Sequence, residues 1–305
     1  MKILITGSTG LLGTALSRRL ARSHEVTGLS RHAPPASSGA RHVVCDLLDE
    51  ARIGTVVGEC QPDVVIHTQA LSDVDQCERE PDLAEAMNVR TTDHLVRALE
   101  RAQPLFIYVS TDYVFDGKKG RPYDEHDAPR PISVYGRSKR DGERLALRFP
   151  RGVVVRPSTL FGPGRITFCD TVARGLQAGL TVEAFADQTT SPTYTEDAAE
   201  MVEALIGSLR ASRERWASRV YHVTNAGSCT RVELACRVAA LLGCPRDRIR
   251  PILMREQHRP ARRPAYSALT TVALPNMTGR TLRPWHEALQ AYLGDRRDAQ
   301  EGVRG

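Results

Sequence analysis

The chain has 305 residues, of which 41% are hydrophobic and 26% are charged, values that are typical of a folded globular protein and exclude wholesale disorder. No apolar run approaches the roughly 18 residues of a membrane-spanning helix, so we expect no membrane segment. The net charge of +6 is dispersed and only 5% of residues are aromatic, which argues against nucleic acid as a partner.

The seven cysteines are scattered along the chain, and no two of them form a Cys-x-x-Cys pair. An odd number of unclustered thiols indicates neither a disulfide framework nor a zinc site, and it fits a reducing compartment. The first predicted strand begins at Ile3, which leaves no room for a signal peptide. We therefore expect a cytoplasmic protein.

The first predicted strand runs into a glycine-rich turn. Residues 3–6 are apolar and β-prone, glycines follow at 7, 10 and 13, and leucines then repeat at helical spacing from 12 to 20. Glycines allow the backbone to turn tightly beside a pyrophosphate, and the N-terminus of the following helix attracts anions. Glycines also occur in ordinary turns, but the position between a strand and a helix favours dinucleotide binding.

The second predicted strand, residues 25–29, ends at Ser30-Arg31-His32. An acidic residue at this position would hold the ribose hydroxyls of NAD, whereas an arginine can pair with a ribose 2′-phosphate. The pattern therefore favours NADPH, with NADH as the alternative cofactor. The simpler interpretation is that Arg31 is one more arginine on a surface loop.

Strands and helices continue to alternate. A third strand at 42–45 precedes Asp46, which either accepts a hydrogen bond from an adenine amino group or caps a helix at 48–58. A fourth strand at 63–67 leads into residues 68–70, a long helix covers 82–101, and a fifth strand covers 105–109. This alternation predicts an α/β fold with a doubly wound parallel sheet, whose ligands collect at the carboxyl edge.

Candidate catalytic residues follow the fifth strand. Thr111 leaves the sheet at its carboxyl edge, and a helix starting near Ser133 carries Tyr135 and Lys139 on one face. A phenol with a pKa of about 10 needs a nearby ammonium to stabilise its phenolate, and a threonine hydroxyl can donate to an oxygen that becomes negative. A solvated surface pair is the alternative, but only four of the 42 basic residues are lysines, and arginine does not replace lysine in this role.

These motifs resemble the extended short-chain dehydrogenase/reductases, and more narrowly the dTDP-4-dehydrorhamnose reductase family. The resemblance rests on Thr6-Gly-x-x-Gly-x-x-Gly13, on Tyr135-x-x-x-Lys139, and on the stretches at 110–117, 187–194, 263–269 and 284–285. It implies a Rossmann-type domain over residues 1–160 and a smaller C-terminal α/β substrate lobe over 161–294, with some chain returning to the first domain. We expect residues 295–305 to form a flexible tail.

The resemblance also implies roles for individual residues. It makes Thr111, Tyr135 and Lys139 catalytic, and it places a dTDP-sugar substrate against Thr111, Asp112, Tyr135, Thr159 and Arg263. Of the arginines at 255, 259, 262 and 263, we select Arg263 as the diphosphate ligand because it lies in a family motif. Besides Tyr135 and Lys139, the cofactor residues are Gly7, Thr9, Gly10, Leu11, Leu12, Ser30, Arg31, Asp46, Leu47, Thr68, Gln69 and Ala70.

The chain departs from the family pattern at two positions. Thr159 stands where the family usually has a tryptophan against the sugar, which leaves the identity of the hexose open. Ala15 stands where some members have a glutamate used in metal-bridged dimerisation, so we expect no metal, while a homodimer stays open.

The resemblance implies an NADPH-dependent reduction of a 4-keto sugar nucleotide. The related 4,6-dehydratases have glutamate where this chain has Tyr113, which argues against dehydration. The alternatives are a regulatory protein similar to the β subunit of methionine adenosyltransferase, an epimerase, and a reductase of a non-sugar ketone.

Overall fold

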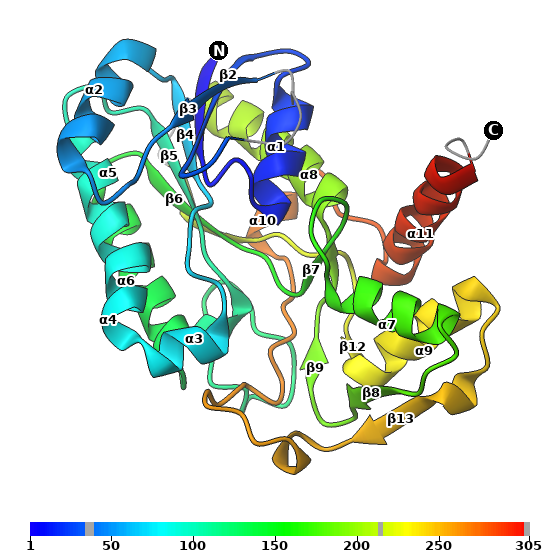
Figure 1. Cartoon of the computed structure of the whole chain (residues 1–305). Helices are drawn as coiled ribbons and strands as arrows, with labels where there is room; N and C mark the ends of the chain where they lie inside the picture. Colours follow the sequence, from blue (N-terminus) through cyan, green and yellow to red (C-terminus); the bar gives the residue numbers. More distant parts are fainter. Residues whose placement is uncertain (34–39, 213–215, 302–305) are drawn as a thin grey trace.

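A seven-stranded parallel sheet forms the centre of the larger lobe (Figure 1). The structure is a computed structural model, and it describes residues 1–33, 40–212 and 216–301, with side chains through residue 295. The strand order is β11-β6-β5-β4-β1-β2-β3. The strands are β1 (Lys2–Thr6), β2 (Glu25–Ser30), β3 (Arg41–Val44), β4 (Val64–His67), β5 (Leu105–Val109), β6 (Gly152–Arg156) and β11 (Val220–His222).

Helices cover both faces of this sheet, because successive side chains of a strand point to opposite faces. Ile3 and Ile5 pack with α1, α8 and α10, whereas Leu4 packs with α2, α5 and α6 on the other side. The predicted doubly wound parallel sheet is confirmed. The helices are α1 (Leu11–Leu20), α2 (Glu50–Cys60), α5 (Thr91–Leu99), α6 (Val134–Arg148), α8 (Thr195–Ala211) and α10 (Ala273–Thr278).

A smaller lobe with its own hydrophobic core lies beside the carboxyl edge of the sheet (Figure 1). It is built around α7, α9 and α11, and a two-stranded parallel sheet of β8 and β13 covers it. The chain returns to the larger lobe between these elements to form α8, β11 and α10. The elements of the smaller lobe are α7 (Phe168–Gln177), β8 (Val182–Phe185), α9 (Arg231–Leu242), β13 (Ile249–Ile252) and α11 (Trp285–Glu301).

Short elements join the two lobes. β7 pairs with β10 in parallel, and β9 pairs with β12 in antiparallel fashion. The helices α3 and α4 lie beside α6, together with the π-helical segment η1. The bounds are α3 (Val74–Arg79), α4 (Pro81–Glu85), η1 (Ala86–Arg90), η2 (Asp112–Val114), β7 (Leu160–Phe161), β9 (Thr189–Thr190), β10 (Thr193–Tyr194), β12 (Cys229–Thr230), η3 (Arg246–Arg248) and η4 (Met254–Glu256).

The structure adds detail to two expectations from the sequence. The helix expected at 82–101 is interrupted by the wider turn of η1, where the side chain of Asn88 bonds the backbone of Leu71 and the hydroxyl of Ser138. The flexible tail expected from residue 295 is helical as far as Glu301, because α11 starts on the core of the smaller lobe and continues through residues that favour helix. Residues 302–305 lie outside the described part. No helix among the described residues is long and apolar enough to cross a membrane.

The strand order places a switch point between β1 and β4. β2 and β3 extend the sheet to one side of β1, whereas β4, β5 and β6 extend it to the other. The segments that follow β1 and β4 therefore diverge at the carboxyl edge of the sheet and leave a crevice between them. Open α/β sheets bind their ligands in such crevices.

Candidate active site

Close backbone contacts fix the glycine turn between β1 and α1. Gly7 has a φ of +66°, and a Cβ added to it would lie 2.7 Å from the backbone nitrogen of Gln69. A Cβ on Gly13 would lie 2.2 Å from the carbonyl oxygen of Gly7, so neither position accepts a side chain without backbone movement. α1 begins after Gly10, with no capping side chain and no acidic residue in its first turn. Its N-terminus is therefore suited to an anion.

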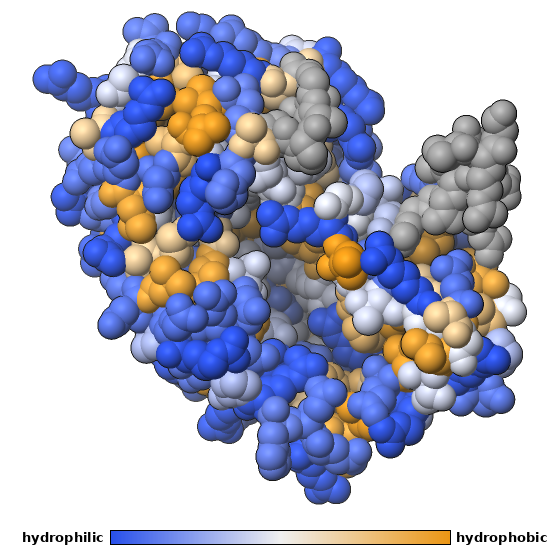
Figure 2. All heavy atoms as spheres, in the orientation of Figure 1, coloured by the Kyte–Doolittle hydropathy of each residue, from blue (hydrophilic) through white to orange (hydrophobic). Residues whose placement is uncertain are grey.

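A cavity of about 790 Å³ lies against this turn, within the usual range of small-molecule sites. Figure 2 shows the hollow between the two lobes on this face of the molecule. Most of the lining comes from the segments that follow β1 to β5, so the cavity occupies the switch point. It includes every residue expected to bind the cofactor: Gly7, Thr9, Gly10, Leu11, Leu12, Ser30, Arg31, Asp46, Leu47, Thr68, Gln69, Ala70, Tyr135 and Lys139.

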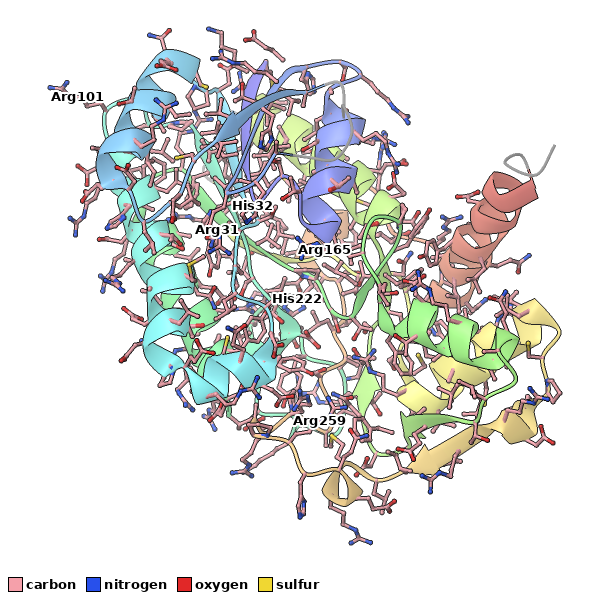
Figure 3. All side chains as sticks on the ribbon, viewed as in Figure 1. Arg31, His32, Arg101, Arg165, His222 and Arg259 are labelled. Carbon is pink, nitrogen blue, oxygen red and sulfur yellow. The ribbon has the colours of Figure 1, made fainter. Side chains whose placement is uncertain are left out.

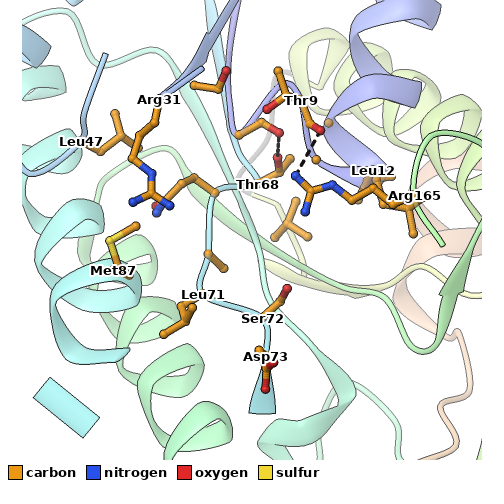
Figure 4. Close-up of a pocket in the computed structure, with 18 of the residues that line it drawn as sticks. Thr9, Leu12, Arg31, Leu47, Thr68, Leu71, Ser72, Asp73, Met87 and Arg165 are labelled. Atoms are coloured by element: carbon orange, nitrogen blue, oxygen red, sulfur yellow. Dashed lines mark hydrogen bonds between the residues drawn. The ribbon is translucent and has the colours of Figure 1, made fainter. Parts of the chain in front are cut away.

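One side of this cavity carries Arg31, which lies beside Leu47 in Figure 4. The hydroxyl of Ser30 donates to the carbonyl of His32 at 2.6 Å and so fixes the turn that presents Arg31. The exposed guanidinium is suited to a phosphate. The residues therefore fit a dinucleotide with a 2′-phosphate, which keeps NADPH as the preferred cofactor.

Asp46 lies in the same lining, but it does not cap the following helix. Its carboxylate accepts a hydrogen bond from the backbone nitrogen of Leu48 at 3.0 Å. α2 begins later, and its cap is Asp49, which accepts from the backbone nitrogen of Arg52 at 2.9 Å. The interpretation of Asp46 as the helix cap is therefore wrong, and its carboxylate is exposed at the cavity.

The helix that carries the predicted acid is held close to the sheet edge. α6 is capped by Ser133, whose hydroxyl accepts from the backbone nitrogen of Gly136 at 3.2 Å. A Cβ on Gly136 would lie 2.2 Å from the carbonyl oxygen of Tyr113, so only glycine allows the first turn of α6 to pack this tightly. Tyr135 and Lys139, one turn apart, consequently line the same cavity as the glycine turn.

Lys139 is buried, with 2% of its surface exposed. Its ammonium nitrogen lies 4.1 Å from the ring centroid of Tyr108, which supports it through a cation–π contact. Burial lowers the pKa of Lys139 to about 7, and the negative charge of Glu143, one turn further along α6, partly opposes this effect. The side chain is therefore about half protonated near pH 7, and added negative charge in the cavity favours its protonated form.

Tyr135 packs edge-on against Tyr113, with ring centroids 5.9 Å apart. Burial raises the pKa of Tyr135 above its usual value of 10, and a hydrogen bond with Thr111 acts in the opposite direction. We expected Lys139 to lower this pKa, but it is not among the main causes of the shift. The phenol is therefore protonated at neutral pH, which is the form that a proton donor needs.

Asp112 joins three segments that are far apart in the chain. Its carboxylate is 3% exposed and accepts hydrogen bonds from the hydroxyls of Thr111 at 3.1 Å, Ser158 at 2.8 Å and Ser267 at 2.6 Å. Burial raises its pKa, while these three hydrogen bonds lower it. The contact between Asp112 and a substrate stays a prediction, since Asp112 lines neither described cavity. In the structure it fixes the position of Thr111.

A second cavity of about 310 Å³ lies between the lobes, next to Tyr113. Two arginines stack over phenylalanines in its wall: the guanidinium carbon of Arg231 lies 5.0 Å from the ring centroid of Phe168, and that of Arg259 lies 5.2 Å from that of Phe185. Aromatic and cationic groups together suit a nucleoside diphosphate. Figure 3 shows Arg259 at the lower end of this region.

The predicted substrate residues differ in how they relate to this second cavity. Arg263 lines it, but its guanidinium forms a bidentate pair with Asp75 at 2.7 and 3.0 Å, so it is already neutralised. Thr159 lines neither described cavity; its hydroxyl is hydrogen-bonded to that of Thr190, and its φ is +35°. Both substrate contacts stay predictions.

Sequence reasoning missed Arg231 at this cavity. A signal was present, because Arg231 is the first residue of α9, where a cation opposes the helix dipole. A residue that weakens its own helix is a candidate for another role. The sequence also gave no reason to select Arg165, which lines the first cavity from the segment after β7.

The family described as the RmlD substrate binding domain matches residues 1–297. The chain belongs to this family. A dTDP-4-dehydrorhamnose reductase from Streptomyces griseus is 36% identical over 288 residues, which are 94% of this chain and 91% of that protein. The spore coat polysaccharide biosynthesis protein SpsK of Bacillus subtilis is 33% identical over 300 residues, 98% and 99% of the two chains.

Two solved structures have the same fold. A dTDP-4-dehydrorhamnose reductase from Bacillus anthracis, crystallised with NADP, has a TM-score of 0.86 and 29% identity, and the match covers 97% of this chain and all of that one. A dTDP-glucose 4,6-dehydratase from the same organism has a TM-score of 0.81 at 17% identity, over 99% of this chain and 98% of that one. The second likeness concerns the fold alone.

Proposed function

We propose that this protein reduces the 4-keto group of a dTDP-linked 4-keto-6-deoxyhexose with NADPH. The observation that carries the proposal is that Tyr135 and Lys139 line the same cavity as the glycine turn. Relatives named dTDP-4-dehydrorhamnose reductase match nearly the whole chain, and one was crystallised with NADP. The second cavity, with Arg231 and Arg259, supplies groups that suit a nucleoside diphosphate beside Tyr113.

The residues divide the reaction between them. The glycine turn and Arg31 would hold NADPH, which would supply the hydride for C4 of the sugar. Tyr135 donates its phenolic proton to the ketone oxygen, so that the ketone gains one hydride and one proton and becomes an alcohol. The ammonium of Lys139 stabilises the phenolate that remains. The hydroxyl of Thr111 turns from Asp112 to the ketone oxygen and stabilises the negative charge that develops there.

The test follows NADPH oxidation at 340 nm with a panel of dTDP-4-keto-6-deoxyhexoses. In Tyr135→Phe we expect kcat to fall by about a hundredfold or more, because general acid catalysis contributes roughly 10²–10⁴. We expect NADPH affinity to stay within a few fold, since the ring is kept. Tyr266→Phe, at a tyrosine that lines neither described cavity, is the matched control with normal turnover.

Undiminished turnover by Tyr135→Phe would overturn the assigned mechanism. NADPH binding by the wild-type protein without turnover on any sugar of the panel would instead favour a regulatory role.

We also propose a cytoplasmic location, supported by seven unpaired cysteines. A homodimer is to be tested by light scattering.

A further inference from the structure

A segment of the smaller lobe reaches the first cavity. Residues 162–167 connect β7 to α7, and within them Arg165 and Ile166 belong to the lining of the dinucleotide cavity. The guanidinium of Arg165 donates a hydrogen bond to the carbonyl oxygen of Thr9 at 3.4 Å, which is long for such a bond. Figure 4 shows Arg165 beside Thr9 and Leu12, on the opposite side of the cavity from Arg31.

Both ends of this segment are anchored. A Cβ on Gly162 would lie 2.0 Å from the hydroxyl oxygen of Thr195, so the backbone there packs directly against α8. At the other end Thr167 and Asp170 form a capping box at the start of α7. Gly164 lies between the two anchors with a φ of +108° and open space around it. The two anchored ends of the segment therefore hold Arg165 beside the glycine turn.

No carboxylate within the described part of the chain pairs with Arg165. None of the ion pairs among the described residues uses its guanidinium, although that group has five N–H donors. The adjacent N-terminus of α1 has no acidic residue in its first turn and no capping side chain. Two positively polarised groups thus face one space, and they are complementary to an anion held between them.

The neighbouring side chain indicates that the occupant is large. Ile166 is 65% exposed, although it lines the cavity. A single exposed apolar side chain is ordinary on an open surface. At the wall of a ligand cavity, however, its apolar surface leaves water only when a ligand covers it. A small inorganic anion at the glycine turn would not cover Ile166, whereas a dinucleotide running through the cavity would.

We propose that Arg165 binds the diphosphate bridge of the dinucleotide from the side opposite the glycine turn. This inference rests on the proposed function, because it assumes that the cavity holds NADPH. Arg165 and Arg31 then have separate tasks. The diphosphate is common to NADPH and NADH, whereas only NADPH has the 2′-phosphate that suits Arg31. Arg165 also couples cofactor binding to the smaller lobe, since its segment leads directly into α7 of that lobe.

The test is a set of dissociation constants for NADPH and NADH, measured by calorimetry on the full-length protein. Arg165→Ala should raise both constants by a similar factor of about ten or more, the value of a charge-assisted hydrogen bond. Arg31→Ala should raise the constant for NADPH and leave that for NADH unchanged. Arg101→Ala removes an exposed arginine far from the cavity (Figure 3) and should change neither.

The outcomes separate this inference from the proposed function. Binding of both dinucleotides by Arg165→Ala with wild-type affinity would overturn the role of Arg165 and leave the proposed function intact. A loss for NADPH alone would also overturn it, because Arg165 would then contact the 2′-phosphate. A wild-type protein that binds neither dinucleotide would contradict both. Arg165→Lys, which keeps the charge but loses the planar fork, should recover part of the affinity, and circular dichroism checks the fold of each variant.

Discussion

The buried ammonium of Lys139 should make the stability of the protein depend on pH. Its pKa is about 7 in the folded protein and 10.5 in the unfolded chain. Between these values the unfolded state binds more protons than the folded state, so the free energy of unfolding rises with pH. From pH 7 to pH 9 the folded lysine changes from half protonated to neutral, while the unfolded lysine stays charged. The contribution of Lys139 over this range is about 2 kcal/mol.

Lys139→Met isolates this contribution, because methionine has a similar length and no charge. Urea unfolding at several pH values gives the free energy of unfolding of each protein. We expect the difference between wild type and Lys139→Met to shift by about 2 kcal/mol in favour of the wild type from pH 7 to pH 9. Lys118→Met removes an exposed lysine and should show no such shift.

A difference between wild type and Lys139→Met that stays constant from pH 7 to pH 9 would refute the reasoning. It would mean that water or Glu143 keeps the ammonium stable at 139, despite an exposure of 2%. We expect the variant to be the more stable protein below pH 7, since it no longer buries a charge, and to lose catalytic activity. Stability and function would then oppose each other at one position.

Two further predictions concern residues around the cavities. Gly13→Ala places a Cβ 2.2 Å from the backbone oxygen of Gly7, so we expect α1 to shift. The free energy of unfolding should fall by roughly 1–3 kcal/mol, and the affinity for NADPH should fall in the same variant. Unchanged NADPH binding in calorimetry would contradict this. Arg263→Ala leaves the half-buried carboxylate of Asp75 without its partner. We expect the free energy of unfolding, measured with urea, to fall by about 1–3 kcal/mol. Adding Asp75→Asn to this variant should restore part of the loss.

Local chemistry determined the elements that are predicted to hold the cofactor and the acid. The strand and glycine turn at residues 3–13 could be predicted because the period of apolar residues and the need for glycine at a positive φ act over a few neighbours. The same holds for α6, where a serine cap and a spacing of four residues place Tyr135 and Lys139 on one face. Propensity and spacing are properties of short segments, so one sequence suffices to find them.

Contacts between segments far apart in the chain were decided only by the tertiary structure. The interruption at η1 depends on where Asn88 meets the backbone of Leu71, which no local pattern shows. The sequence identified Asp112 as the neighbour of Thr111, the threonine predicted to be catalytic. It did not show that Asp112 is buried under Ser267, which is 155 residues away. Arg263 was expected to hold a diphosphate, yet it pairs with Asp75, which is 188 residues away.

The sequence by itself therefore determined the sheet, the glycine turn and the helix of the predicted proton donor, because each follows from local spacing and backbone geometry. Only the packing of one lobe on the other decided which cations stay available to a ligand. Arg165 and Arg231 face cavities because no carboxylate of the opposite lobe reaches them among the described residues, whereas Asp75 reaches Arg263. Coulomb interactions of this kind depend on a few ångströms between distant segments, and such distances are set by the fold.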